Sequence, residues 1–142
     1  MAEKPEMPPV TVGYILEAPG RPSIEQQKLS LGLHGVTFDE RGRYFWDVVK
    51  KKTTRPQSVL LKRRTLISFL HPGDTLVVAG VECLGLSEAD VEWFLGEVSG
   101  RGAQIIVNGG SVVVQPETDT TEIVDRVKRF QKALHMRNYR SK

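Results

Sequence analysis

Continuous apolar runs recur along this chain, separated by segments of mixed polarity. The clearest are residues 10–16 (VTVGYIL), 74–80 (DTLVVAG) and 103–107 (AQIIV). Runs of this length without polar alternation are typical of parallel strands that helices cover on both faces. The aromatic and β-branched stretch at 44–49 predicts another strand, and residues 111–115 predict a short extended segment.

Two helices are predicted in the first half of the chain. Ser23 and Gln26 have the spacing of a capping box, which opens a helix that ends near Gly35. The apolar positions of this helix are Ile24, Leu29, and Leu31 or Leu33. A second helix is expected over residues 57–70, because the sequence His-Pro-Gly follows it as a stop signal.

Two further helices are predicted in the second half. Ser87 and Asp90 open one of them, and its apolar positions have the spacing of a single helix face: Val91, Phe94, Leu95 and Val98. The last helix is expected to start at Asp119, with Glu122 in its first turn. Its apolar stripe is Ile123, Val127, Phe130 and Leu134.

Strands alternating with helices at these lengths predict an α/β fold, a three-layer sandwich with a mostly parallel central sheet. We expect this domain to span residues 10–118, after a disordered tail at 1–9. Residues 119–142 then form a C-terminal amphipathic helix with a basic tail. Ligands of such sheets bind at the carboxyl ends of the strands, so the candidate loops are 17–22, 50–56 and 81–87.

Length and composition favour a single domain and exclude a membrane protein. The chain has 142 residues, of which 39% are hydrophobic and 26% charged, and no apolar run approaches the roughly 18 residues needed to span a bilayer. The N-terminus, MAEKPEMPPV, lacks the layout of a secretory signal. Cys83 is the single cysteine and cannot form an internal disulfide, so we expect a cytoplasmic protein.

The distribution of charge says more than the net charge of +3. Between Arg126 and Lys142 there are seven Lys or Arg residues and no acid. These basic residues either form a solvated face or contact phosphates, and the same two interpretations apply to the cluster Lys62, Arg63 and Arg64. The candidate nucleic-acid-binding residues are Lys50, Lys51, Lys52, Arg55, Arg129, Lys132, Arg137, Arg140 and Lys142.

Several common chemistries are excluded by pattern. The sequence has no GxxxxGK[ST] or GxGxxG phosphate motif, and His34, His71 and His135 lack the spacing of metal ligands. We therefore expect no metal and no cofactor. The aromatic run at 44–46 could stack bases, but alternation along a strand favours packing.

Two segments together resemble the catalytic domain of the serine recombinases, the resolvase and invertase family. That family opens with a strand reading roughly G-Y-x-R-V-S-T and a helix containing a Gln, where this chain has GYILEAP at 13–19 and Gln27. The family then has G-D-x-L-x-V, D-R-L-G-R-S, a helix with D-L and a Gly. This chain has GDTLVV at 73–78, ECLGLS at 82–87, Asp90-Val91 and Gly102, so the resemblance covers residues 11–108.

The resemblance implies a site that has lost its reactive groups. In the family a serine attacks a DNA phosphate, and arginines on the first strand and in the later loop surround that phosphate. Such chemistry needs an activated hydroxyl and cationic donors for the phosphoryl oxygens. The matching positions here are Ala18 for the serine, Leu16 for the strand arginine, and Cys83 and Leu86 for the loop arginines. The resemblance therefore implies a pseudoenzyme, not an enzyme.

Three hypotheses follow. The leading one is a non-catalytic serine-recombinase-like protein that binds DNA or a protein partner in DNA recombination, in phage or mobile-element biology, or in gene regulation. The second is a divergent recombinase or nuclease with relocated groups, for which Ser23, Ser87 and Cys83 are the candidates. The third is a protein-interaction module without nucleic-acid binding. The stripe at Ile123, Val127, Phe130 and Leu134 either forms a homodimer or packs on its own sheet.

Overall fold

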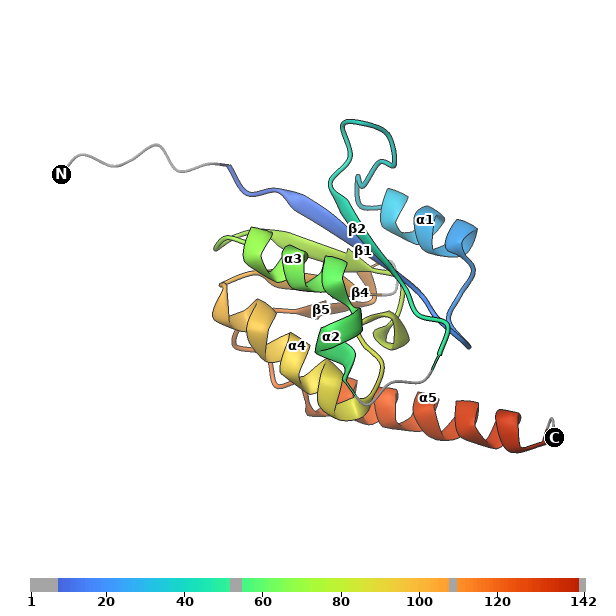
Figure 1. The fold of residues 1–142 in the computed structure, drawn as a ribbon. Coiled ribbons are helices and arrows are strands. Elements are labelled where there is room, and N and C mark those ends of the chain that lie inside the picture. Colours follow the sequence, from blue (N-terminus) through green and yellow to red (C-terminus); the bar gives the residue numbers. More distant parts are fainter. Residues whose placement is uncertain (1–7, 52–54, 108–109, 141–142) are drawn as a thin grey trace.

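The protein is built on one five-stranded sheet, seen in a computed structural model that describes residues 8–51, 55–107 and 110–140 (Figure 1). The strand order is β2-β1-β3-β4-β5; the first four strands are parallel, and β5 is antiparallel to β4. The strands are β1 (Thr11–Glu17), β2 (Tyr44–Val48), β3 (Thr75–Val78), β4 (Gln104–Val107) and β5 (Val112–Val114). The predicted α/β class with a mostly parallel sheet is confirmed.

Helices cover both faces of the sheet, as the buried side chains show. Ile15 and Val77 pack with Leu31 of α1 (Ile24–Gly32) on one face. The opposite face carries the larger cluster, to which α3, α4 and α5 contribute. The remaining helices are α2 (Pro56–Val59), α3 (Leu61–Phe69), the 3-10 turn η1 (Val81–Cys83), α4 (Glu88–Gly100) and α5 (Thr121–Arg140). The three predicted layers are therefore present.

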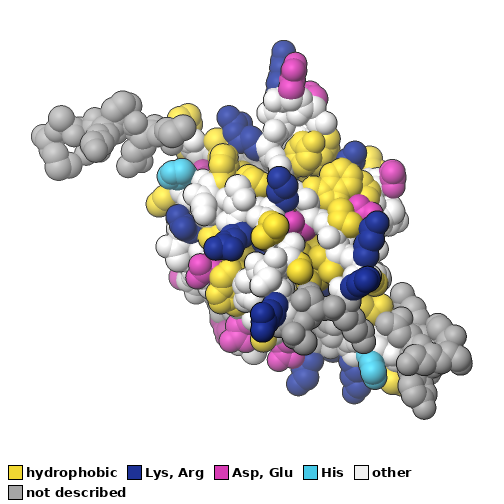
Figure 2. Space-filling view, viewed as in Figure 1, with side chains coloured by type: hydrophobic (Ala, Val, Ile, Leu, Met, Phe, Trp, Pro, Cys, Tyr) yellow, Lys and Arg dark blue, Asp and Glu magenta, His cyan; other side chains and the backbone are white. Residues whose placement is uncertain are grey.

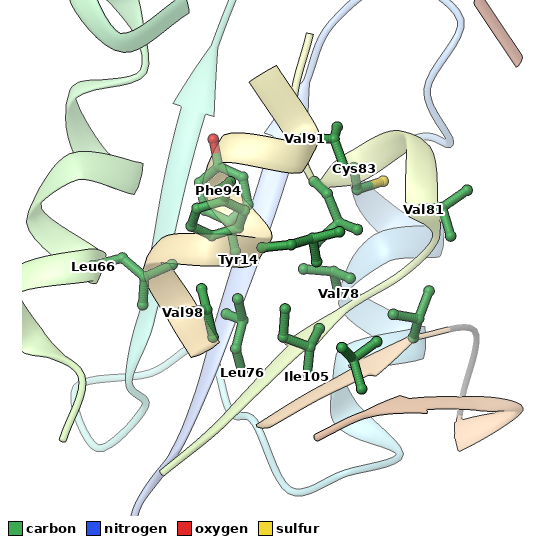
Figure 3. Packing of buried hydrophobic residues seen from close by; sticks show 14 of the residues in the cluster. Tyr14, Leu66, Leu76, Val78, Val81, Cys83, Val91, Phe94, Val98 and Ile105 are labelled. Atoms are coloured by element: carbon green, nitrogen blue, oxygen red, sulfur yellow. The ribbon is translucent and has the colours of Figure 1, made fainter. Parts of the chain in front are cut away.

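Successive side chains of β1 point to opposite faces of the sheet, so every second residue of the strand enters the larger core. Tyr14 points into this core with Phe94 of α4 and Leu76 of β3, as Figure 3 shows. Gly13 lies on the other face, where a Cβ atom would be 2.6 Å from Leu31 Cδ2. The glycine thus lets α1 approach the sheet closely.

The α1 helix confirms its predicted cap but only part of its predicted apolar face. Ser23 and Gln26 form the capping box. Leu31 is buried, whereas Leu29 and Leu33 are 74% and 77% exposed. The reason is that the short helix lies against the sheet along a narrow line, so only Leu31 of these leucines reaches the apolar cluster with Val36.

The helix predicted over 57–70 is two helices, α2 and α3, with Leu60 between them at φ −86° and ψ 65°. The carboxylate of Asp47 on β2 accepts hydrogen bonds from the backbone N–H groups of Lys62 and Arg63. These bonds cap a new helix start at Leu61, because the first N–H groups of a helix have no partner inside it.

The last two helices follow the predicted patterns. All four apolar positions predicted for α4 are buried, and Ser87 is its N-cap. The last helix begins at Thr121, two residues later than predicted, because the Asp119 carboxylate accepts from the Thr121 N–H. Its C-terminal end extends away from the sheet (Figure 1). None of the helices within the described ranges is long and apolar enough to cross a membrane.

Candidate functional site at the carboxyl edge of the sheet

Two of the three predicted loops meet at the carboxyl edge of the sheet. Arg21, which follows β1, donates hydrogen bonds from Nε to Glu82 O at 2.9 Å and from Nη2 to Gly85 O at 2.8 Å. Its Nη1 donates to Pro19 O at 2.9 Å. Loops 17–22 and 81–87 are therefore joined through one guanidinium, which sequence reasoning did not single out.

Arg21 is held from its other side by α5. Its Cζ atom lies 5.0 Å from the centre of the Phe130 ring, within cation–π range. Gly20 has φ +79°, and a Cβ atom there would be 2.7 Å from a methyl group of Leu134. Gln131 donates from Nε2 to Leu86 O at 2.9 Å. The second half of the α5 stripe thus covers this edge.

The first half of the stripe is core. Ile123 and Val127 are 5% and 1% exposed within the larger cluster, so they pack on their own sheet. Phe130 and Leu134 are half-buried over Gly20 and Arg21. Within the described residues, the apolar stripe of α5 therefore packs mostly against the rest of the same chain.

The four positions that the resemblance assigns to lost reactive groups serve in packing. Leu16 and Cys83 are fully buried in the larger core cluster. Ala18 and Leu86 are partly buried and pack against that cluster. These four side chains are apolar or weakly polar, whereas a bound phosphate would need hydrogen-bond donors at their positions.

Cys83 is a poor nucleophile in this position. Burial, and secondly the nearby Glu82 carboxylate, raise the pKa of the Cys83 thiol to about 12, although Arg21 opposes the shift. The thiolate is the reactive form of cysteine, so a thiol with this pKa is inert near neutral pH.

The two candidate serines are engaged as helix caps. Ser23 Oγ accepts from Gln26 N, and Ser87 Oγ accepts from Asp90 N. Capping fixes each hydroxyl at a helix start. Among the described hydrogen bonds, none joins either hydroxyl to a side chain that could act as a general base.

Gln27, at the position that matches the family's glutamine, hydrogen-bonds the backbone of β1 and of the loop that follows it. Its side chain is fully buried, accepts from Leu16 N at 3.1 Å, and donates to Leu16 O at 2.9 Å and Pro22 O at 3.0 Å. It thereby satisfies the backbone of β1 where the strand leaves the sheet, because buried polar groups require partners.

Arg63 is a correction to the predicted basic cluster. Its side chain is 1% exposed and binds both carboxylate oxygens of Asp90. Asp47, whose carboxylate accepts from Arg63 N, also accepts from the Tyr14 hydroxyl at 2.8 Å. Burial raises the pKa of Tyr14, and the Asp47 charge raises it further. This buried network stabilises the fold and leaves Arg63 no phosphate role.

The predicted nucleic-acid-binding residues lie in two groups. Lys50, Lys51 and Arg55 are exposed between β2 and α2. Arg129 and Lys132 are exposed on α5, where Arg129 also pairs with Asp125 at 3.4 Å. Lys52 and Lys142 lie outside the described residues, as do the side chains of Arg137 and Arg140.

The aromatic run on β2 is used in packing, as predicted. Phe45 contacts Phe69 with ring centres 5.8 Å apart, and Tyr44 contacts Phe38 at 4.8 Å. Trp46 donates from Nε1 to Glu17. Among the residues that the structure describes, no group of three or more His, Cys, Asp or Glu side chains is placed to hold a metal ion.

Comparison with models of known protein families finds no match, and comparison with curated proteins finds none either.

Proposed function

We propose that this chain is a non-catalytic, serine-recombinase-like domain that acts by binding DNA. The observation that carries the non-catalytic part of the proposal is the Arg21 guanidinium. Each of its three nitrogens already donates a hydrogen bond to a backbone carbonyl. The edge where the resemblance implies phosphate chemistry is thus closed by Arg21 and by Phe130 above it. Binding elsewhere on the surface remains the function that the chain supports best.

Removing a single preorganised donor typically costs a factor of about 10²–10³ in rate. Here Leu16, Ala18 and Leu86 supply no donor and no nucleophile, and the raised pKa of Cys83 keeps its thiol protonated. Transfer of a phosphoryl group at this edge would require the α5 covering to leave and new cations to enter. We therefore infer a binding role in recombination, in mobile-element or phage biology, or in gene regulation.

The surface that we propose for DNA consists of the exposed cations of α5 and of the segment after β2. Lys128 and Lys132 are exposed and have no ion pair with any described residue, so their charge is available to phosphates. Lys50 and Lys51 are exposed in the segment that follows β2. Arg137, Arg140 and Lys142 add further basic residues later in the sequence.

Two measurements test the proposal. First, incubation with supercoiled plasmid should yield neither nicking nor a covalent protein–DNA adduct. Second, fluorescence anisotropy with a labelled duplex should show affinity that falls steeply with salt, and K128A/K132A should reduce the salt slope by about 1–2. The matched control R41A/R43A removes the same charge from the exposed loop before β2 and should leave the slope unchanged.

The outcomes separate the rival functions. A covalent adduct that C83A or S23A abolishes would establish a divergent recombinase or nuclease with relocated groups. Absent or salt-insensitive DNA binding would favour a protein-interaction module. Equal losses in K128A/K132A and R41A/R43A would show that α5 is not the DNA-binding surface.

A further inference from the structure

A groove of about 460 Å³ opens between α3 and α4, apart from the loops at the carboxyl edge. The polar and aromatic residues that line it are Gln57, Ser58, Arg63, Arg64, Ser68, Trp93, Glu97 and Arg101. Figure 2 views the α2–α3 side of the molecule, with dark blue Lys and Arg side chains spread over it and magenta acids along its lower left edge, at its top and on its right side. The volume lies within the range typical of small-molecule sites, about 300–1,000 Å³.

Trp93 gives the groove an exposed aromatic surface on a fixed support. Its side chain is 39% exposed, although its neighbours Phe94 and Leu95 are buried. The Arg63 Cζ atom lies 5.5 Å from the indole centre, and Arg63 is itself fixed by Asp90 and by Leu84 O. An exposed indole held by a buried, immobile cation is preorganised to stack against a planar ligand.

The charges beside Trp93 are not neutralised within the protein. Trp93, Glu97 and Arg101 follow one another at intervals of four residues, which places them along one side of α4. Glu97 and Arg101 have the spacing of a helical ion pair, yet neither they nor Arg64 pairs with a described residue. Two guanidinium groups and one carboxylate are therefore available to a ligand.

We propose that this groove binds a nucleoside phosphate. The base stacks on Trp93, Arg64 and Arg101 bind the phosphate, and the Glu97 carboxylate accepts N–H groups from the base edge. Because a carboxylate offers acceptors alone, guanine, with two adjacent N–H donors on its Watson–Crick edge, suits Glu97. This site shares no residue with the DNA surface on α5, and it stands or falls independently of that surface.

The ligand has two possible sources, a free nucleotide or an unstacked nucleotide in a single strand. Titration of W46F, in which Trp93 is the remaining tryptophan, with GMP should produce saturable fluorescence quenching, and calorimetry should give the same affinity. Guanosine and inorganic phosphate should each bind at least about tenfold more weakly, because each lacks half of the contacts. A short DNA strand ending in deoxyguanosine, titrated in the K128A/K132A background so that α5 contributes less, then separates the sources, since tighter binding than dGMP indicates a strand and weaker binding a free nucleotide.

Variants locate the binding. In the W46F background, R64A/R101A should weaken GMP binding about tenfold or more, while the equally charged change R41A/R43A should leave it unchanged. E97Q should reduce the preference for GMP over AMP. Absence of saturable binding by both methods would overturn the proposal, as would GMP affinity that R64A/R101A leaves intact.

Discussion

Arg63 and Asp90 form a two-point ion pair in the protein interior, with Nη2–Oδ1 at 2.6 Å and Nη1–Oδ2 at 2.8 Å. Each side chain is 1% exposed, so the pair is shielded from water. Asp90 Oδ2 also accepts from Leu86 N at 2.9 Å, and Arg63 Nη1 donates to Leu84 O. The pair thus joins α3, α4 and the loop that precedes α4.

Removal of one partner of this pair should be strongly destabilising. We expect R63M and D90N each to lower the free energy of unfolding by about 3–5 kcal/mol, because a buried charge is left without its partner. The double variant R63M/D90N should lose less than the sum of the single changes. Urea unfolding followed by circular dichroism measures these values, with E92Q on the exposed face of α4 as control. Additive losses would contradict the coupling.

Asp47 should matter more to stability than its hydroxyl partner Tyr14. Its carboxylate binds Lys62 N at 2.9 Å, Arg63 N at 2.8 Å and the Tyr14 hydroxyl at 2.8 Å. We expect D47A to cost about 3 kcal/mol or more, since two N–H groups of α3 lose their acceptor, and Y14F to cost about 1 kcal/mol. Chemical unfolding of both variants tests this order. Equal costs would show that Asp47 does not cap α3.

Arg21 should hold the carboxyl edge closed. We expect R21M to lower the free energy of unfolding by about 1–3 kcal/mol, because the carbonyls of Glu82 and Gly85 lose a charged donor. Native-state hydrogen exchange should speed up selectively in residues 81–86 and in α5 around Phe130. R41M, a change at an exposed arginine, is the matched control. Unchanged exchange at 81–86 in R21M would refute the closing role.

Cys83 should react with thiol reagents only after the protein opens. Alkylation at pH 8 should be slow in the native state and fast in urea, because burial raises the thiol pKa to about 12 from an ordinary value of 9.0. The folded state favours the neutral thiol, so stability should fall as pH rises from about 9 toward 12, where the unfolded chain ionises first. This decline should be smaller in C83A. Rapid native alkylation would contradict the burial.

Elements whose signals are local in the chain could be predicted from sequence. The apolar runs of β1, β3 and β4, the capping box at Ser23 and Gln26, and the buried stripe of α4 each depend on residues a few positions apart. The alternation of these elements was sufficient to predict the α/β class. The serine-recombinase resemblance stays a prediction, because the fold class does not test it.

Long-range partners decided what the sequence could not. Arg63 belongs to a run of three basic residues, which indicates an exposed face. It is buried instead, because its guanidinium pairs with Asp90, 27 positions later. Arg21 meets carbonyls 61 and 64 positions away. The new helix start after Leu60 is capped by Asp47, which lies on β2 and is 15 positions away from Lys62.

The sequence by itself thus determined the strands and most of the helices, because hydrophobic period and capping act over a few residues. Only the tertiary structure decided which polar side chains are buried and which edge is closed. Burial of a charge is favourable only when a partner arrives with matching geometry, and that partner is set by the packing of distant elements.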